Sequence, residues 1–286
     1  MNSLSPSEKR QRNDHGRRGD PPPAPEPLPA PVLDSHTHLD LVGGDPDHWL
    51  AEAAAVNVTR VVQVGCDVPS SRYGVDLAHR NRAVLATVAL HPNEAPRLGD
   101  RLDEALREIE AMAADPRVRG IGETGLDHFR TGEDGREAQE RSFRAHIAIA
   151  KRYNKVLVIH DRDAHADILR VVDSEGAPEH VVMHCFSGDA SFALECVKRG
   201  FALSFAGTVT FTSAAGLREA AHVTPLDQVL VETDSPFLTP MPYRGRPNNS
   251  YLVPLTVRSL ATAMGVDLTE LCDAISANGE RIFGPW

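Results

Sequence analysis

The sequence lacks the features that define several large protein classes. Among its 286 residues there are four cysteines, and no two of them form a C-x-x-C pair. A structural zinc knuckle is therefore not expected, nor is a disulfide framework in so long a chain. We interpret them as reduced thiols of a cytoplasmic protein: Cys66, Cys185, Cys196 and Cys272.

Long apolar runs and an excess of basic charge are also missing. No window approaches the roughly 18 apolar residues of a membrane span, and the N-terminus has no secretory h-region, so no membrane association is expected. The formal net charge is −10, which excludes nonspecific adhesion to polyanions at long range. A nucleic-acid substrate stays possible, because bound cations and local arginines reverse the field inside a cleft. No obligate protein partner is evident.

The first 31 residues differ in composition from the rest. Residues 1–20 are polar and carry no apolar period, and residues 21–31 read PPPAPEPLPAP. Such a segment buries too little apolar surface to offset its ordering entropy. We predict a disordered or polyproline-like N-terminal tail over residues 1–31, with a proline-rich partner ligand as the alternative, and one barrel domain over residues 32–286.

After residue 31, short apolar β-branched runs alternate with helical patterns. Runs of this kind are typical of buried parallel strands, and eight strands alternating with helices predict a (β/α)8 TIM barrel of the α/β class. An open doubly wound sheet is the rival, but no glycine-rich phosphate loop follows the first run. The eight runs are Val32–Asp34, Arg60–Gly65, Ala83–Leu90, Val118–Glu123, Val156–His160, Val181–His184, Phe201–Phe205 and Val229–Glu232.

Several spacers show the period of an amphipathic helix. Apolar stripes appear within residues 102–113, 143–150 and 253–264, and the last of these is stopped by Gly265. Asp267 then has the position of the N-cap of a final helix, with Glu270 three residues later.

Polar side chains stand where these strands meet the following loops. His36 and His38 are two apart on one strand, so both point to the same side. In an α/β barrel all strand ends converge on the active face, which predicts a metal site there. Its proposed ligands are His36, His38, Glu123, His160, His184 and Asp234.

Each candidate ligand has a purely structural alternative. A lone His160 or His184 is often a hydrogen-bonded core residue, Glu123 can pair with an arginine, and Asp234 can cap the turn at Ser235–Pro236. Together they exceed one tetrahedral site, so we predict two divalent ions, of Zn, Mg, Mn or Co, bridged by Glu123. Asp234 would ligate one ion and accept a proton, which makes Glu123 and Asp234 the catalytic candidates.

Six segments in order resemble the TatD family of metal-dependent deoxyribonucleases: DSHTHLD, GETGLDHFR, IHDRDAHAD, MHCFSGD, VETDSPFL and RGRPNN. The resemblance runs from Val32 to Phe283. It implies a metal pair in a barrel, held by the six residues named above, and phosphodiester hydrolysis of DNA, often by a 3′-to-5′ exonuclease. The chain departs from the family after RG-x-x-N, where an acidic residue and proline are usual and Asn249 and Ser250 stand here.

Other residues near the strand ends are candidates for substrate contact. Arg162 offers a forked hydrogen bond to phosphate, unless it pairs with Asp161 or Asp163, and Ser187 with Gly188 offers backbone N–H groups to an anion. The remaining substrate candidates are His91, Arg244, Arg246 and Asn248.

Three functions fit these residues to different degrees. The first is a deoxyribonuclease that acts on DNA, single-stranded by expectation, with a metal-activated water. The second is a metal-dependent hydrolase of an amide, lactone or aminoacyl ester, since one barrel serves many substrates. The third, a noncatalytic binding protein, is disfavoured by the complete ligand set. Cations around the cleft discriminate the first from the second, and Arg130, Arg162, Arg244 and Arg246 are the candidates.

Overall fold

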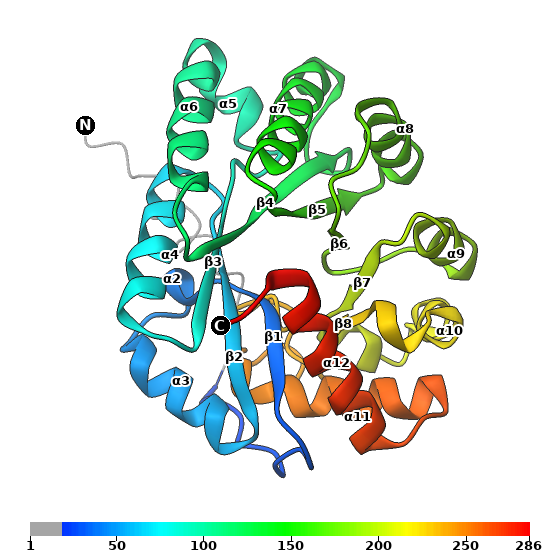
Figure 1. Cartoon of the computed structure of the whole chain (residues 1–286). Helices are drawn as coiled ribbons and strands as arrows, with labels where there is room; N and C mark the ends of the chain where they lie inside the picture. Colours follow the sequence, from blue (N-terminus) through cyan, green and yellow to red (C-terminus); the bar gives the residue numbers. More distant parts are fainter. Residues whose placement is uncertain (1–18) are drawn as a thin grey trace.

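A computed structural model describes residues 19–286, in which eight parallel strands run in chain order around a nearly closed barrel (Figure 1). This confirms the predicted fold class. Seven of the strand runs end within a few residues of their predicted bounds, whereas β4 continues through Asp127, which pairs with Arg162 of β5. The strands are β1 Val32–Thr37, β2 Val58–Val64, β3 Val84–Val88, β4 Val118–Asp127, β5 Val156–Arg162, β6 Val181–Met183, β7 Ala202–Phe205 and β8 Val229–Val231.

The barrel closes between its first and last strands. Thr37 forms a parallel bridge with Ser235, the N–H of His38 donates to the carbonyl of Ser235 at 2.8 Å, and the N–H of Asp234 donates to the carbonyl of His36 at 2.9 Å. The seam therefore joins two segments that the chain separates by about two hundred residues, and it brings three of the proposed ligands side by side.

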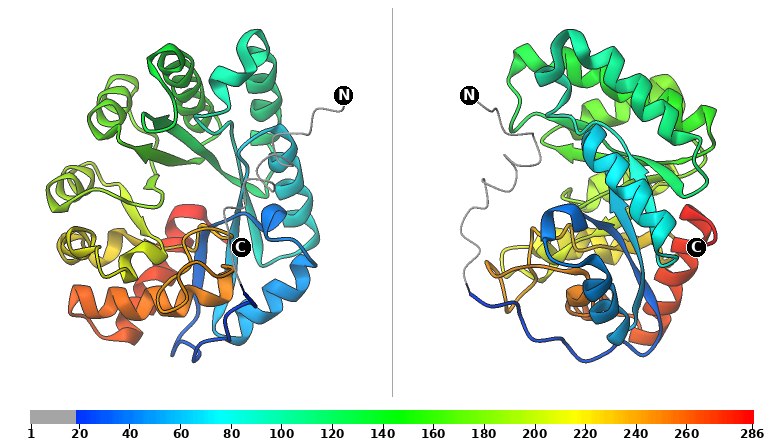
Figure 2. Two further views of the ribbon diagram at one scale, coloured as in Figure 1. Left: turned by 180° about the vertical axis from the view of Figure 1, so that it is seen from behind. Right: turned by 90° about the vertical axis from the view of Figure 1, so that its left-hand side faces the viewer.

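Helices surround the strands on the outside (Figure 2). The predicted helix over residues 253–264 is observed with those bounds, and Gly265 follows it in the left-handed conformation, φ 70°. Asp267 caps the last helix by accepting from the N–H groups of Thr269 and Glu270. The α-helices are α2 Leu39–Val42, α3 Pro46–Ala55, α4 Val68–Arg80, α5 Ala95–Leu98, α6 Leu102–Ala113, α7 Glu133–Arg152, α8 His165–Glu175, α9 Ala190–Lys198, α10 Ala215–Val223, α11 Val253–Met264 and α12 Leu268–Phe283. Short 3₁₀ helices are η1 Gly99–Arg101, η2 Gly207–Thr210, η3 Leu226–Gln228 and η4 Ser250–Leu252.

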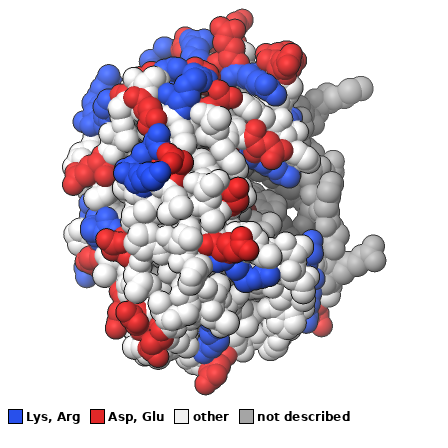
Figure 3. Space-filling model, turned by 90° about the vertical axis from the view of Figure 1, so that its right-hand side faces the viewer, with Lys and Arg blue, Asp and Glu red and all other residues white. Residues whose placement is uncertain are grey.

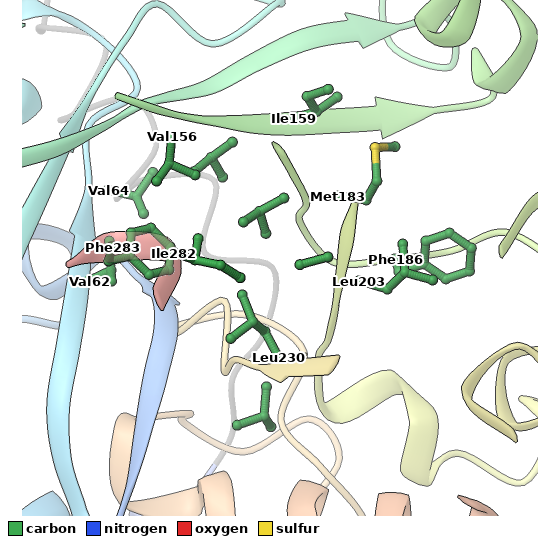
Figure 4. Close-up of a cluster of buried hydrophobic side chains, with 14 of the residues drawn as sticks. Val62, Val64, Val156, Ile159, Met183, Phe186, Leu203, Leu230, Ile282 and Phe283 are labelled. Carbon is green, nitrogen blue, oxygen red and sulfur yellow. The ribbon is translucent and has the colours of Figure 1, made fainter. Parts of the chain in front are cut away.

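The barrel interior is filled by apolar side chains from the strands. Val62, Val156, Leu203 and Leu230 converge there, and Phe283 of α12 joins the cluster (Figure 4). Burying a Val, Leu or Phe side chain contributes about 1.5–3 kcal/mol. This packed core gives the strand ends fixed positions from which to present polar side chains.

The tail that we predicted to be disordered or polyproline-like has partners on the barrel in the part that the structure describes. Residues 19–31 have no regular structure but lie along the barrel beside the loop that precedes η4 (Figure 2, right). Leu28 is 2 % exposed and its N–H donates to Val56 at 3.2 Å. The hydroxyl of Tyr251 donates to the carbonyl of Pro22 at 2.7 Å, and Arg258 donates to that of Pro27 at 3.0 Å. The prediction of disorder for residues 1–18 lies outside the described residues.

The outer surface mixes charges of both signs. On the face shown in Figure 3, acidic and basic side chains alternate rather than separating into fields. Ion pairs between neighbouring helices account for part of this pattern, such as Arg199 with Asp173 at 2.9 Å and Arg170 with Glu140 at 2.7 Å. Over residues 19–286, no helix combines the length and apolarity that crossing a membrane requires.

Candidate metal centre

All six proposed ligands meet at one end of the barrel. β1 supplies His36, β4 supplies Glu123, and β5 supplies His160. The other three follow strands: His38 comes directly after β1, His184 directly after β6, and Asp234 three residues after β8. The rings of His36 and His184 stack with their centroids 3.6 Å apart, although half of the barrel separates their strands in sequence.

One group of ligand atoms gathers around the β1–β8 seam. Nε2 of His36 and Nε2 of His38 are 3.3 Å apart, and Oδ1 of Asp234 lies 3.4 Å from Nε2 of His38 and 3.9 Å from Nε2 of His36. Ligand atoms held about 2.0–2.1 Å from one tetrahedral ion are about 3.3–3.4 Å apart. The separations at the seam are therefore those of neighbouring ligands.

Glu123 stands between this group and a second one. Its Oε1 lies 3.7 Å from Nε2 of His38, while its Oε2 lies 3.1 Å from Nε2 of His184 and 3.4 Å from Nδ1 of His160. Each carboxylate oxygen thus faces a different set of imidazoles. Glu123 would therefore contact a cation held by either set.

Hydrogen bonds fix which ring nitrogen of two histidines faces the cluster. Nδ1 of His184 is 2.9 Å from Oε1 of Glu232, and Nδ1 of His38 is 3.2 Å from the carbonyl oxygen of Val64. Both partners only accept, so each Nδ1 carries the proton and each Nε2 presents a lone pair. Carboxylate support of this kind orients metal-binding histidines in proteins.

The donor set fits a cation. When the histidines are neutral, two of their lone pairs face carboxylate oxygens, so that a hydrogen-bond acceptor faces another acceptor. Nε2 of His38 is 3.4 Å from Oδ1 of Asp234, and Nε2 of His184 is 3.1 Å from Oε2 of Glu123. The side chains of His36, His38, His184 and Glu123 are at most 6 % exposed, so water does not separate them. Buried acceptors that face one another are costly unless protons or metal ions lie between them. Imidazole nitrogen with carboxylate oxygen suits divalent ions such as zinc, manganese and cobalt.

The charges of the cluster are strongly coupled. Burial lowers the pKa of His36 far below its ordinary value, and the stacked His184 adds to the effect, which keeps that imidazole neutral. Burial works to raise the pKa of Glu123, but His91, His160 and His184 together hold it well below its usual range. An ionised Glu123 and a neutral His36 are the protonation states in which these two residues can bind a metal ion.

Two residues that the sequence did not single out as ligands also enter the cluster. Sγ of Cys66, two residues after β2, is 2.9 Å from Oε1 of Glu123. Nε2 of His91, predicted as a substrate contact, is 3.9 Å from Oε2 of Glu123, and its ring centroid is 4.5 Å from that of His160. Both are therefore in contact with the same carboxylate. Position at a strand end was the signal that identified His91 and would also have identified Cys66.

Sequence reasoning also missed the supporting carboxylates. Glu232 is the last residue of the predicted eighth strand run and is fully buried, and Oδ2 of Asp127 is 3.4 Å from Nε2 of His160. A buried acidic residue inside an apolar run was the available signal for Glu232. Asp127 gave none, because its strand continues through a Thr-Gly segment that does not have a strand pattern.

The predicted substrate contacts separate into two groups. Arg162 makes no ion pair with Asp161, Asp163 or any other described acidic residue, and Arg244 and Ser187 are partly or largely exposed on the loops of the same face. Arg246 instead donates to the carbonyl of Asp20 at 2.6 Å. Asn248 is 2 % exposed and donates to the carbonyl of Thr233 at 3.0 Å, so both contact the chain itself.

The loop after β8 depends on Asp34. Its carboxylate accepts from the N–H of Thr233 at 2.9 Å and from the hydroxyl of Ser250 at 2.7 Å. Ser250 stands where the family usually has another residue, and its own N–H donates to Asn249 at 2.7 Å, which caps η4. Burial raises the pKa of Asp34 to about 6. The departure from the family pattern therefore keeps the helix start ordered.

The turn that follows Asp234 is closed by the main chain. The N–H of Phe237 donates to the carbonyl oxygen of Asp234 at 2.8 Å, and the Asp234 carboxylate points to His38 instead. Asp234 has φ 52°, a left-handed conformation in which Asp and Asn are the usual non-glycine residues. Its side chain is thus available to the cluster.

Comparison with known proteins gives a consistent assignment. The family model described as TatD related DNase matches residues 33–284. A Mycobacterium tuberculosis protein called uncharacterized metal-dependent hydrolase TatD is 44 % identical over 261 residues, which are 88 % of this chain and 98 % of that protein. Bacillus subtilis YabD, with the same description as a metal-dependent hydrolase, is 36 % identical over 88 % of this chain and 98 % of its own.

Solved structures agree on the fold. The TatD homologue YjjV of Escherichia coli superposes with a TM-score of 0.81 at 24 % identity, covering 88 % of this chain and 97 % of that one. A TatD family hydrolase of Entamoeba histolytica gives 0.78 at 17 % identity, covering 91 % and 100 %. With the family model and the sequence relatives, the site geometry leads to one conclusion: the chain belongs to the TatD family and is a metal-dependent hydrolase.

Proposed function

We propose that this protein is a deoxyribonuclease that hydrolyses phosphodiester bonds of single-stranded DNA from the 3′ end, with two divalent ions held by the six-residue cluster. The observation that carries the proposal is the position of Arg162. It lies two residues after His160 on β5, so both side chains leave the strand on the same side. Arg162 also lies near Cys185, the residue after the ligand His184. Burial raises the pKa of the Cys185 thiol, and the positive charge of Arg162 acts against that rise.

A guanidinium that forms no ion pair with an acidic residue of the described chain, residues 19–286, suits a phosphate. Arginine presents a planar fork of donors that matches two phosphate oxygens. Neither a lactone nor a neutral amide substrate needs a fixed cation at this place. Arg162 thus favours a phosphodiester over the other bonds that the same barrel hydrolyses in other proteins.

The residues of the chain have distinct parts in this proposal. Divalent ions in such a site act as Lewis acids and activate water. Glu123 joins the two halves of the cluster, Glu232 holds the ring of His184, and Asp234 accepts a proton from the attacking water at the partly exposed edge of the site. Arg162 holds the phosphate for in-line attack.

The test is hydrolysis by the purified full chain of a single strand labelled at its 5′ end. Separate reactions contain Zn, Mn, Mg or Co, and a chelator arm provides the metal-free control. We expect a ladder that shortens from the 3′ end, stops with chelator and returns with metal, and slows on a strand blocked at its 3′ end. The proposal fails if folded, metal-replete protein leaves DNA intact with every metal but hydrolyses an ester, lactone or amide panel.

A further inference from the structure

Exposed apolar side chains concentrate around the metal centre. In the described part of the chain the exposed large apolar residues are Phe129 at 63 %, Leu194 at 42 %, Phe237 at 40 % and Met241 at 38 %. Leu194 is on the outer helix α9, whereas the other three are in the loops that follow β4 and β8. Exposed apolar side chains that gather on one face mark binding surfaces, and here three of the four are on loops of the face that carries the metal centre.

The two exposed aromatic rings follow residues of the metal centre on different sides of the barrel. Phe129 comes two residues after Asp127, whose carboxylate is 3.4 Å from His160. Phe237 comes three residues after Asp234, and its ring centroid is 6.3 Å from that of His38, at an interplanar angle of 71°. The two rings therefore belong to the β4–β5 part and the β8–β1 part of the active face.

Arginines from one segment of the active face stack on aromatic rings from the neighbouring segment. The guanidinium of Arg162 lies over the ring of Phe129 at 4.1 Å, and that of Arg244, after β8, lies over the ring of Phe211, after β7, at 4.4 Å. A guanidinium stacked in this way keeps its charge and its donors. Each pair offers a flat surface and a cation together.

We propose that Phe129 and Phe237 are base-stacking platforms for a single-stranded polynucleotide, with Arg162 and Arg244 contacting its phosphates. Rings that stack bases, alternating with cations that follow the backbone, are the general means of binding single strands without reading sequence. A duplex keeps its base faces inside, so this surface discriminates against it. The inference rests on the proposed function, since it describes how the same site would hold its substrate.

Fluorescence anisotropy of the metal-loaded full chain, with both probes made with phosphorothioate linkages that resist hydrolysis, tests the platforms. One probe is a labelled oligothymidylate, and the second is an abasic strand of equal length and charge. We expect Phe129→Ala and Phe237→Ala each to weaken binding of oligothymidylate about tenfold, with less than a twofold effect on the abasic strand. Phe129→Trp keeps the ring and should retain binding.

Two further variants separate stacking from charge and from general apolarity. Leu194→Ala removes an equally exposed apolar side chain from α9 and should leave both affinities unchanged. Arg162→Gln should weaken both probes and reduce the salt dependence of binding, because it removes a phosphate contact.

The outcomes distinguish this inference from the proposed function. If the protein digests DNA but both Phe→Ala variants bind as the wild type does, or lose affinity equally for both probes, the platforms are refuted and the nuclease stands. If single-strand binding depends on the two rings but no metal supports hydrolysis, the nuclease proposal falls and the platforms stand. Stronger binding to a duplex than to the single strand would also overturn the inference.

Discussion

Replacing Asp234 by asparagine separates proton transfer from metal binding. The substitution keeps the size of the side chain and one oxygen facing Nε2 of His38, from which the carboxylate is now 3.4 Å away. Asparagine also tolerates the φ of 52° at this position. The fold and the seam hydrogen bond from the N–H of residue 234 to His36 should persist, because that bond uses only the main chain.

The expected magnitude follows from what asparagine cannot do. An amide does not accept a proton from water as a carboxylate does, and loss of a general base typically costs about 10²- to 10⁴-fold in rate. His160, His184 and Glu123 are unaffected and should still hold at least one ion. We therefore expect turnover to fall at least about 10²-fold, with metal still bound and the melting temperature close to that of the wild type.

Turnover, metal content and melting temperature are to be measured on one preparation of Asp234→Asn. Asp163→Asn is the matched control, because Asp163 also has a left-handed φ, 56°, in a loop that follows a barrel strand, but it is exposed and outside the ligand cluster. It should behave as the wild type in all three measurements. Near-normal turnover of a fully folded Asp234→Asn protein would remove Asp234 from the chemistry.

Three other perturbations have definite expected results. Glu232→Gln should weaken metal binding about 10- to 100-fold in a chelator competition, because it removes the charge that supports His184; unchanged affinity would show that the contact is only structural. Burial lowers the pKa of His146 from 6.5 to about 4, so the unfolded state binds this proton more tightly, and up to roughly 3 kcal/mol of stability present above pH 6.5 is lost as the pH falls towards 4. His146→Gln should make the urea midpoint less dependent on pH between 4 and 6.5. An unchanged dependence on pH would show that His146 is not the group responsible. Deleting residues 2–30 should lower the urea midpoint by the equivalent of a few kcal/mol, because it removes buried Leu28, whereas deleting residues 2–18 keeps that contact; equal midpoints for the two deletions would show that the segment does not stabilise the barrel.

The sequence predicted the barrel because its strands are buried on both sides. A parallel strand between a packed interior and a layer of helices must be apolar throughout, as Val229–Val231 and Val156–Ile159 are, and such runs stand out between helical periods. The end of β4 was not predictable in this way. Residues 124–127 contain a glycine and a carboxylate, yet their main chain pairs with β5 and they are buried. Gly125 has φ 138°, and a Cβ there would clash with the carbonyl oxygen of His160.

The packing of residues 21–31 could not be read from composition. One large apolar residue, Leu28, among prolines predicts little burial. The segment nevertheless stays on the barrel through partners that are distant in sequence. Tyr251 and Arg258 donate to its carbonyl oxygens, which a proline-rich segment presents without any competing helix or strand. Proline also lowers the entropy that is lost when the segment docks. The composition indicates that the segment can bury little apolar surface, but it does not indicate the hydrogen bonds that hold the segment on the barrel.

The closure of the barrel explains why the metal ligands were easier to predict than the buried carboxylates that support the site. A strand end brings its side chain to the active face whatever the neighbouring strands contain, so His36, His184 and Asp234 follow from the fold alone. The supports depend on which strands become neighbours in space. Asp34 is buried at the start of the chain's first strand, and it accepts hydrogen bonds from Thr233 and Ser250, which lie about two hundred residues further on.

That network has a consequence for the order of assembly. The carboxylate of Asp34 is fully buried, and burial raises its pKa to about 6. Burying the ionised carboxylate is therefore favourable only once its hydrogen-bond donors are in place. Those donors arrive when β8 pairs across the seam with β1, which is the same event that brings Asp234 to His36 and His38. Half of the cluster therefore forms only in the closed barrel, and a metal ion bound there stabilises the closed state over any open one by mass action. Removing metal should accordingly loosen the β1–β8 seam more than the pairing of β4 with β5, and hydrogen exchange at the N–H of His38 and of Asp234, compared with that of Ile159 in β5, measures the difference. Equal protection of both regions with and without metal would show that the barrel closes independently of its ions.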